Sequence, residues 1–232
     1  MAHEYTKNEI IEKLNCASLD IATFYKQDFI NYLGYTKDTN ELYSEVISEW
    51  CLEHLSLFQQ IPQITRTASY KTETHNGAVK NARSNRTEEL IAMEMFRQGG
   101  LPIIGKVLDY QTPLKNKRAD KAGKIDLLAY DGNTLRILEL KEPDSTETML
   151  RCVLEGYTYL HTVNIEKLLR DFSLPAGTAV EACPFVFLNG QQHNEMNEQR
   201  PALKRLMTQL NVKPFYCTKD KGKLYTVVEG ER

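Results

Sequence analysis

The spacing of hydrophobic and polar positions divides the 232-residue chain into three parts. Apolar residues recur at helical spacing in residues 1–60, most clearly in "TNELYSEVISEWCLEHLSLF". Residues 61–86 are polar and have no helical period. From residue 87 onward, amphipathic segments alternate with short β-rich runs. We therefore predict a helical N-terminal region over 1–60, an irregular or partly extended connection over 61–86, and a core with C-terminal strands over 87–232.

The order of elements in the core predicts an α/β fold. A helix is indicated by "TEELIAMEMFRQGG", which has acids in its first turn and a double glycine at its end. An extended run, "LPIIGKVLDYQTPL", precedes the strands "KIDLLAY" and "ILELK"; a long helix with a break near Asn164 precedes the strand "EACPFVFLNG". Three consecutive strands followed by crossover helices give an α+β-like mixed sheet flanked by helices, with an antiparallel hairpin beside a parallel portion.

The hairpin carries charged residues where a buried sheet would place apolar ones. Asp126 lies in its first strand, and Glu139 and Lys141 share one face of its second strand because side chains alternate. The turn sequence Asp131-Gly132 favours an even number of loop residues. A two-residue loop makes Asp126 and Glu139 diagonal neighbours, whereas a four-residue loop makes them directly opposed. Either loop gathers the three charged side chains on one face.

A shared divalent cation would explain these charges. Two carboxylates that face each other across a sheet repel, and a buried charge is costly unless it is paired or bound to metal. Oxygen ligands favour magnesium or manganese over zinc. The cation would lower the pKa of a bound water and neutralise phosphate oxygens, and Lys141 would position the water or a phosphate oxygen rather than act as a general base. The structural alternative is an exposed strand that simply alternates polar and apolar residues.

An acid in "GKID" is followed after about a dozen residues by "ELK". A helix with glutamates precedes this pair of strands, and a second helix follows it. This order of the charged residues and helices resembles the PD-(D/E)xK nuclease superfamily. The resemblance covers residues 87–188. It implies a restriction-endonuclease-like core with a helical N-terminal extension. It also implies Mg²⁺-dependent hydrolysis of phosphodiester bonds, in DNA more often than in RNA, with Mn²⁺ as a substitute. By the same resemblance, Asp126, Glu139 and the backbone carbonyl of Leu140 hold the metal, and Lys141 completes the catalytic set.

The resemblance assigns further residues on two helices. Superfamily members usually carry a metal-binding glutamate on the first core helix, where Glu89 matches better and Glu88 stays open as the alternative. Glu155-x-x-x-Tyr159 resembles a pattern on the helix after the lysine, with Glu in place of the usual Gln. Arg151 lies on the same helical face and is the expected ion partner of Glu155. Arg151 and Tyr159 are therefore candidates for contact with nucleic acid.

Charge and cysteine content predict a surface that binds phosphates and a cellular compartment. The formal net charge is −2, but residues 106–124 are locally basic, so Lys115, Lys117 and Arg118 are candidates for contact with phosphates. Five scattered cysteines without a CxxC pair indicate a reducing compartment, and we expect a cytoplasmic protein. No apolar run reaches the length of a membrane span, and the start of the sequence lacks the features of a signal peptide.

Two functional hypotheses follow. The first is a metal-dependent nuclease that acts on DNA, with RNA as the alternative substrate. The second is a catalytically inactive nuclease-fold protein that binds nucleic acid or another protein. Because superfamily members often dimerise, the resemblance also suggests a homodimer.

Overall fold

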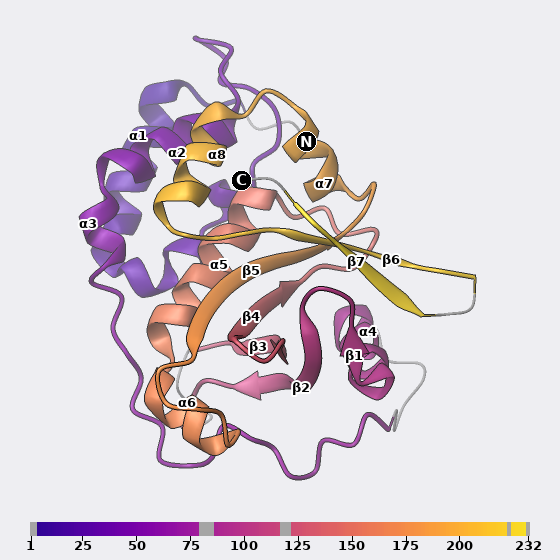
Figure 1. Ribbon diagram of the computed structural model, residues 1–232. Helices are drawn as coiled ribbons and strands as arrows, with labels where there is room; N and C mark the ends of the chain where they lie inside the picture. Colours follow the sequence, from indigo (N-terminus) through magenta and orange to yellow (C-terminus); the bar gives the residue numbers. More distant parts are fainter. Residues whose placement is uncertain (1–3, 79–85, 117–121, 222–223, 231–232) are drawn as a thin grey trace.

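A single mixed β-sheet organises the protein. The computed structural model describes residues 4–78, 86–116, 122–221 and 224–230. Within them seven strands form one sheet whose spatial order equals the chain order (Figure 1). Strands β1 to β4 are antiparallel, β4, β5 and β6 are parallel, and β6 and β7 are antiparallel. The strands are β1 (Gly100–Leu101), β2 (Gly105–Pro113), β3 (Lys124–Tyr130), β4 (Thr134–Leu140), β5 (Ala179–Phe187), β6 (Phe215–Lys219) and β7 (Tyr225–Glu229).

Helices cover both faces of this sheet, which confirms the predicted mixed α/β architecture. The helix α4 lies on one face, and α5 lies on the other with the N-terminal helices packed outside it (Figure 1). The α-helices are α1 (Lys7–Ala17), α2 (Tyr43–Glu53), α3 (Leu55–Phe58), α4 (Thr87–Gln98), α5 (Met149–Thr162), α6 (Ile165–Asp171), α7 (Gln191–Asn197) and α8 (Pro201–Gln209), and the 3₁₀ helices are η1 (Ser18–Lys26) and η2 (Asp28–Asn31).

Side chains that alternate between the two faces of the hairpin strands explain why the sheet has one hydrophobic core on each face. Leu128 and Ile137 belong to the core that includes α5, whereas their chain neighbours Leu127 and Leu138 belong to the core that includes α4. Neighbouring residues in a strand point to opposite faces, so the strands that are covered on both sides are apolar at nearly every position. Asp126 and Glu139 interrupt this apolar pattern.

Several predicted boundaries are confirmed, and one helix type differs. The helix α4 begins at Thr87 and ends at Gly99, whose φ of 81° is the left-handed conformation that glycine adopts easily. Asn164 separates α5 from α6 and caps α6 by accepting the Lys167 N–H at 2.9 Å. The segment after α1 is 3₁₀ rather than α-helical, with Asp20 in a non-helical conformation at its kink. Residues 61–78 contain neither helix nor strand.

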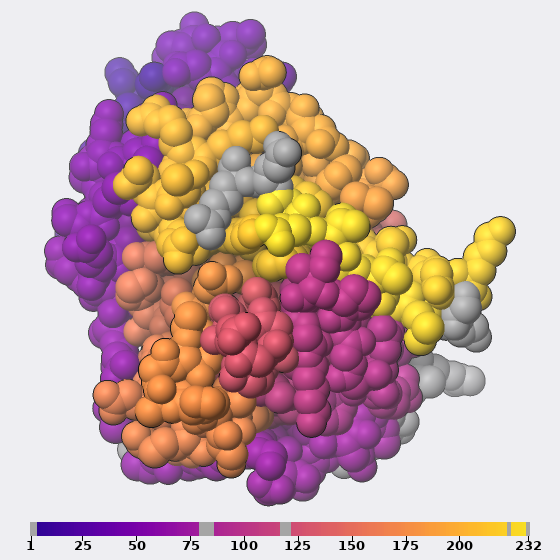
Figure 2. Space-filling model, in the orientation of Figure 1, coloured from indigo at the N-terminus to yellow at the C-terminus, as the bar shows by residue number. Residues whose placement is uncertain are grey.

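The N-terminal region shares its hydrophobic core with α5 and one face of the sheet. Phe24 lies at its centre, with its ring stacked on Trp50 at a centroid distance of 5.6 Å and meeting the edges of Phe29 and Phe58. The hairpin of β6 and β7, by contrast, projects from the body of the molecule (Figure 2). Among the helices that the structure describes, none has the length and apolar character needed to cross a bilayer.

Truncation of Phe24 to Ala should therefore destabilise the whole protein. We expect the free energy of unfolding to fall by about 3–5 kcal/mol, because the ring is buried and its loss leaves a cavity. Trp50 is the only tryptophan of the chain, so its fluorescence reports on the N-terminal region while far-UV circular dichroism reports on all elements. The two urea transitions should coincide in wild type and variant. Loss of the Trp50 transition ahead of the circular dichroism signal would show that residues 4–60 unfold independently.

Candidate functional site

The β3–β4 hairpin has a four-residue loop, which is one of the two loop lengths that the sequence allowed. Tyr130 pairs with Leu135, and continuation of that register places Asp126 opposite Glu139. The Asp131 carboxylate accepts two backbone N–H bonds inside the loop, each 2.8 Å long, and thereby fixes its shape. The even loop therefore brings the two acids to the same end and the same face of the hairpin.

The backbone ladder of the hairpin ends next to Asp126. The last regular pair is Leu127 with Leu138. Beyond it, the Leu140 N–H donates to Asp126 Oδ2 at 3.0 Å, so a side-chain carboxylate replaces a backbone acceptor. Asp126 Oδ1 accepts a second bond from Gln111 Nε2 of β2 at 2.8 Å. These two bonds fix the carboxylate at the point where the strands part.

Lys141 is surrounded by carboxylates. Its Nζ lies 2.7 Å from Glu139, 2.8 Å from Glu147 and 3.6 Å from Glu155. The lysine is only 5% exposed and Glu139 is 3% exposed, so these charges are screened little by water. Lys141 therefore supplies the positive charge that makes the buried acids tolerable.

Glu139 is held against α5. A methyl group added at Gly156 would lie 3.7 Å from its Cβ, an ordinary van der Waals distance, so the helix packs directly against this part of the strand. One oxygen, Oε1, bonds to Lys141, whereas Oε2 is buried and has no hydrogen-bond partner among the described residues. A buried carboxylate oxygen without a donor is costly, and it is the kind of atom that a bound cation satisfies.

The two glutamates of α4 differ in their surroundings. Glu89 lies 3.2 Å from Arg86 in an ion pair near the start of the helix. Burial raises the pKa of Glu88, while Lys141 and a backbone hydrogen bond from Glu142 act in the opposite direction. The charge of Glu88 also acts on Asp126. Both glutamates line the same cleft, but Glu88 is the one that interacts with the hairpin acids, which favours the alternative that the sequence left open.

A cleft of about 580 Å³ opens at this end of the hairpin and α4. Acids dominate its lining, with Arg86 and Lys124 as the basic residues. A phosphodiester group would meet a net negative wall here unless a cation accompanied it. The lining residues are Arg86, Thr87, Glu88, Glu89, Gln111, Lys124, Asp126, Glu142, Asp144, Ser145, Thr146 and Glu147.

Burial shifts the titration of the hairpin groups. Burial raises the pKa of Asp126 from its ordinary value of 3.8 to about 7, although Lys141 opposes this shift. Burial and then the charge of Glu155 raise the pKa of Glu139 well above its ordinary value. Burial alone would lower the pKa of Lys141, but Glu139 and the neighbouring negative groups outweigh it and raise that pKa. Lys141 is therefore protonated and can supply positive charge.

The helix after the lysine departs from the expected pairing. Arg151 lies 3.1 Å from Glu147 and not beside Glu155. Glu155 instead accepts the Tyr159 hydroxyl at 2.7 Å and faces Lys141. Lys141 takes the place of the expected arginine because β4 brings it between α5 and the sheet. Glu147 and Glu155 lie four residues before and four residues after Arg151, so helical spacing alone could not show which of the two pairs with this arginine.

The candidates for nucleic-acid contact are placed unevenly. Tyr159 is 6% exposed and belongs to the hydrophobic core, so it is not available to a polymer at the surface. Arg151 and Lys115 are partly exposed. The Lys115 carbonyl accepts a hydrogen bond from Arg66, which ties the end of β2 to the connecting segment. Lys117 and Arg118 lie outside the described residues.

The donor set suits an oxygen-seeking cation. In a strand the N–H and C=O of one residue point toward the same neighbouring strand, so the Leu140 carbonyl points toward β3 together with the N–H that binds Asp126. The Asp126 carboxylate, the unpartnered Glu139 oxygen and this carbonyl are all oxygen donors. Within the described ranges, no three His, Cys, Asp or Glu side chains already stand as a metal-holding group.

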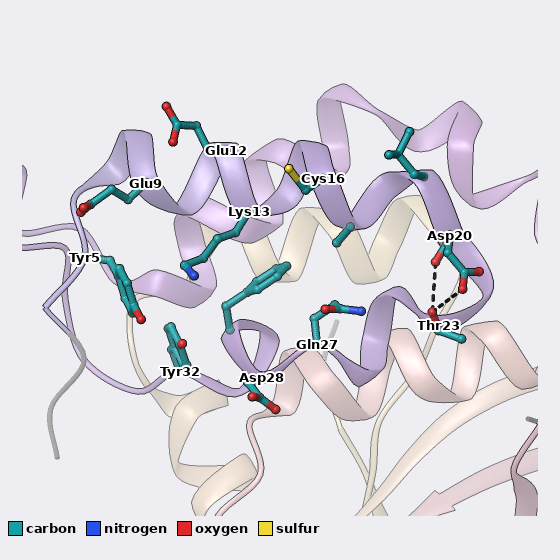
Figure 3. A pocket seen from close by; sticks show the side chains of 13 residues that line it. Tyr5, Glu9, Glu12, Lys13, Cys16, Asp20, Thr23, Gln27, Asp28 and Tyr32 are labelled. Carbon is teal, nitrogen blue, oxygen red and sulfur yellow. Dashed lines mark hydrogen bonds between the residues drawn. The ribbon is translucent and has the colours of Figure 1, made fainter.

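A larger cavity, of about 860 Å³, lies in the N-terminal region between α1 and the 3₁₀ helices (Figure 3). Its walls include Glu9, Glu12, Asp20 and Asp28 against Lys13. This surface would repel a polyanion, and none of the residues predicted for the hairpin site lines it. The hairpin cleft is therefore the stronger candidate despite its smaller volume.

No family model, curated protein or solved structure matches this chain. The function must therefore be argued from the geometry of the site.

Three residues of the site were not identified from the sequence. Glu147 reaches Lys141 only because the segment between β4 and α5 turns back over the strand end. Gln111 lies at the position opposite Asp126 in the β2–β3 register, but the extended run before β3 gave no register from which to infer this. Cys152 is buried on α5, and its burial raises the pKa of the thiol, while Lys141 acts to lower that pKa and Glu139 to raise it. The hydrophobic period of α5 would have predicted the burial of Cys152, although not its neighbours.

The raised pKa of Asp126 predicts a stability that falls as pH rises. Between about pH 4 and 7 the folded state keeps a proton that the unfolded state releases, so unfolding becomes easier with pH. The slope contributed by one such group is at most about 1.4 kcal/mol per pH unit. Urea unfolding with a chelator present would measure it, and Asp126→Asn is the matched variant. The stability of the variant relative to wild type should increase with pH through this window; a constant difference would contradict the raised pKa.

Proposed function

We propose that this protein is a Mg²⁺-dependent nuclease that hydrolyses phosphodiester bonds, those of DNA in preference to those of RNA, with Mn²⁺ as a substitute metal. The observation that carries the proposal is the opposition of Asp126 and Glu139 at the open end of the hairpin, with Lys141 on the same face. The order of elements supports it, since α4 with its glutamates precedes the hairpin and α5 follows it. The mixed sheet is compatible with a restriction-endonuclease-like core.

Each residue has a role that its surroundings support. Asp126, Glu139 and the Leu140 carbonyl would hold the metal, and Glu88 would extend this set from α4, in place of Glu89. A bound Mg²⁺ lowers the pKa of water and neutralises charge on phosphate oxygens. Lys141 is protonated and buried, so it would stabilise the developing negative charge at the phosphate rather than remove a proton.

The charge balance around Lys141, beside the cleft, favours a cation-dependent reaction. Asp126 and Glu139, with Glu147 and Glu155 beside them, exceed the positive charge that Lys141 supplies. A polyanion alone would be repelled by this excess, whereas a divalent cation would turn it into attraction. Lys124 and Arg86 at the rim of the cleft are suited to contact the sugar-phosphate backbone on either side.

One observation favours a second function, an inactive nuclease-fold protein that binds nucleic acid or protein. The Lys141 ammonium already bonds to Glu139, and among the described residues no metal-holding group is complete as it stands. A lysine that permanently neutralised these acids would leave a stable fold without catalysis. Cleavage assays separate the two functions.

The first assay tests dependence on the hairpin. Wild type should cleave DNA with Mg²⁺ or Mn²⁺ and not with a chelator. Asp126→Ala should lose about 10²–10³-fold in rate because a metal ligand is removed, and Lys141→Ala should lose about as much because charge stabilisation at the phosphate is removed. Plasmid, linear duplex and single-stranded DNA and RNA would be compared. Asp144→Ala is the matched control, since this exposed acid lines the same cleft, and it should cleave as wild type does. Equal residual cleavage by all four proteins would indicate contamination and support the inactive alternative.

The second assay decides between the glutamates of α4. Glu88→Gln should slow cleavage at least about tenfold, because an acid that interacts with Asp126 and Lys141 would be lost. Glu89→Gln removes only an ion pair with Arg86 near the helix start and should change the rate little. Initial rates across a Mg²⁺ titration would measure both variants. The opposite ranking would assign the metal-binding role to Glu89, as the resemblance alone suggested.

A further inference from the structure

Gln111 has an unusual backbone conformation inside a β-strand. Its φ is 48°, in the left-handed region that side chains other than glycine rarely occupy. The strand β2 pairs with β3 in register on both sides, through Tyr110 with Leu127 and Thr112 with Ile125, and the pair between them is not formed. The missing pair would join Gln111 to the residue opposite it, Asp126. Strain of this kind persists only where surrounding structure enforces it, and it concentrates at functional sites.

The side chain of Gln111 uses this conformation to reach Asp126. Its Nε2 donates to Asp126 Oδ1 at 2.8 Å, while the Leu140 N–H donates to Oδ2 at 3.0 Å. Each carboxylate oxygen therefore receives one bond from a different neighbouring strand. Rotation of the carboxylate is prevented, and each oxygen keeps a further lone pair for a cation. At Asp126 the pairing of β3 with β2 is interrupted for one residue, and the pairing of β3 with β4 has already ended at Leu127.

We propose that Gln111 is a positioning residue that holds the Asp126 carboxylate in the orientation needed to bind a divalent cation, and that the left-handed backbone serves to aim its amide there. This inference rests on the proposed metal site. Residues that hydrogen-bond to metal ligands orient them, and their loss typically weakens metal binding about 10–100-fold. A Gln that served only the stability of the sheet would instead occupy an ordinary extended conformation and form its ladder pair.

Two variants separate the amide from the backbone. Gln111→Gly removes the amide and relieves the positive φ, since glycine adopts this region freely. Gln111→Met keeps the length of the side chain, removes its amide and leaves the positive φ in place. Ile103→Gly is the matched control, because Ile103 also has a positive φ, of 71°, but lies 51% exposed in the turn between β1 and β2 and does not line the cleft.

Calorimetric titration with Mn²⁺ and thermal unfolding without metal provide the test. Both Gln111 variants should bind Mn²⁺ about 10–100-fold more weakly than wild type. Gln111→Gly should melt at or above the wild-type temperature, and Ile103→Gly should bind Mn²⁺ as wild type does. Asp126→Ala sets the level of binding elsewhere on the surface.

The outcomes distinguish this inference from the function on which it rests. Unchanged Mn²⁺ affinity in either Gln111 variant, while wild type binds through Asp126, overturns the role of Gln111 and leaves the metal site intact. A Gln111→Gly protein that loses affinity and melting temperature together overturns it as well, because that result assigns the residue to the sheet. Wild type that binds no more Mn²⁺ than Asp126→Ala overturns both the metal site and the inference.

Discussion

The charge balance around Lys141 is the constraint on which the rest of the site depends. Carboxylates at the centre of an α/β sandwich are expensive to desolvate, and they are tolerated here because a buried ammonium lies within 2.7 and 2.8 Å of Glu139 and Glu147. One lysine cannot neutralise all the acids that converge on it, even with Arg151 beside Glu147. The fold is therefore stable enough to hold these acids together while it leaves them short of positive charge. A divalent cation would supply what is missing.

Local rules account for the part of this arrangement that the sequence predicted. Alternation in a strand fixes Glu139 and Lys141 on one face, and an even loop adds Asp126, so these residues follow from period and turn alone. The apolar pattern of the remaining strands likewise predicted the mixed sheet. Glu147 and Gln111 could not be predicted in this way, because one depends on the path of a connecting segment and the other on an irregularity in β2.

Elements outside the hairpin hold that connecting segment in place. The Thr148 N–H donates to Asn31 Oδ1 of η2 at 2.6 Å, and Gln192 Nε2 of α7 donates to the Glu147 carbonyl at 2.6 Å. Glu147 therefore owes its position over Lys141 to residues more than a hundred positions earlier and some forty-five positions later in the chain. The N-terminal region, for which the sequence suggested no role, helps to fix the geometry of the site because it shares a core with α5.

The irregular backbone of the sheet lies where the proposed chemistry requires it. Regular pairing would bond the Asp126 backbone to Gln111 of β2 and would leave the Asp126 carboxylate to repel Glu139. Instead, the β2–β3 ladder misses the one pair at this residue, the β3–β4 ladder ends just before it, and two hydrogen bonds to its carboxylate are made there. A protein that only needed a stable sheet would gain nothing from such an exchange, since it replaces satisfied pairs by a buried charge and a strained φ. The exchange is understandable if the freed carboxylate has a ligand to bind.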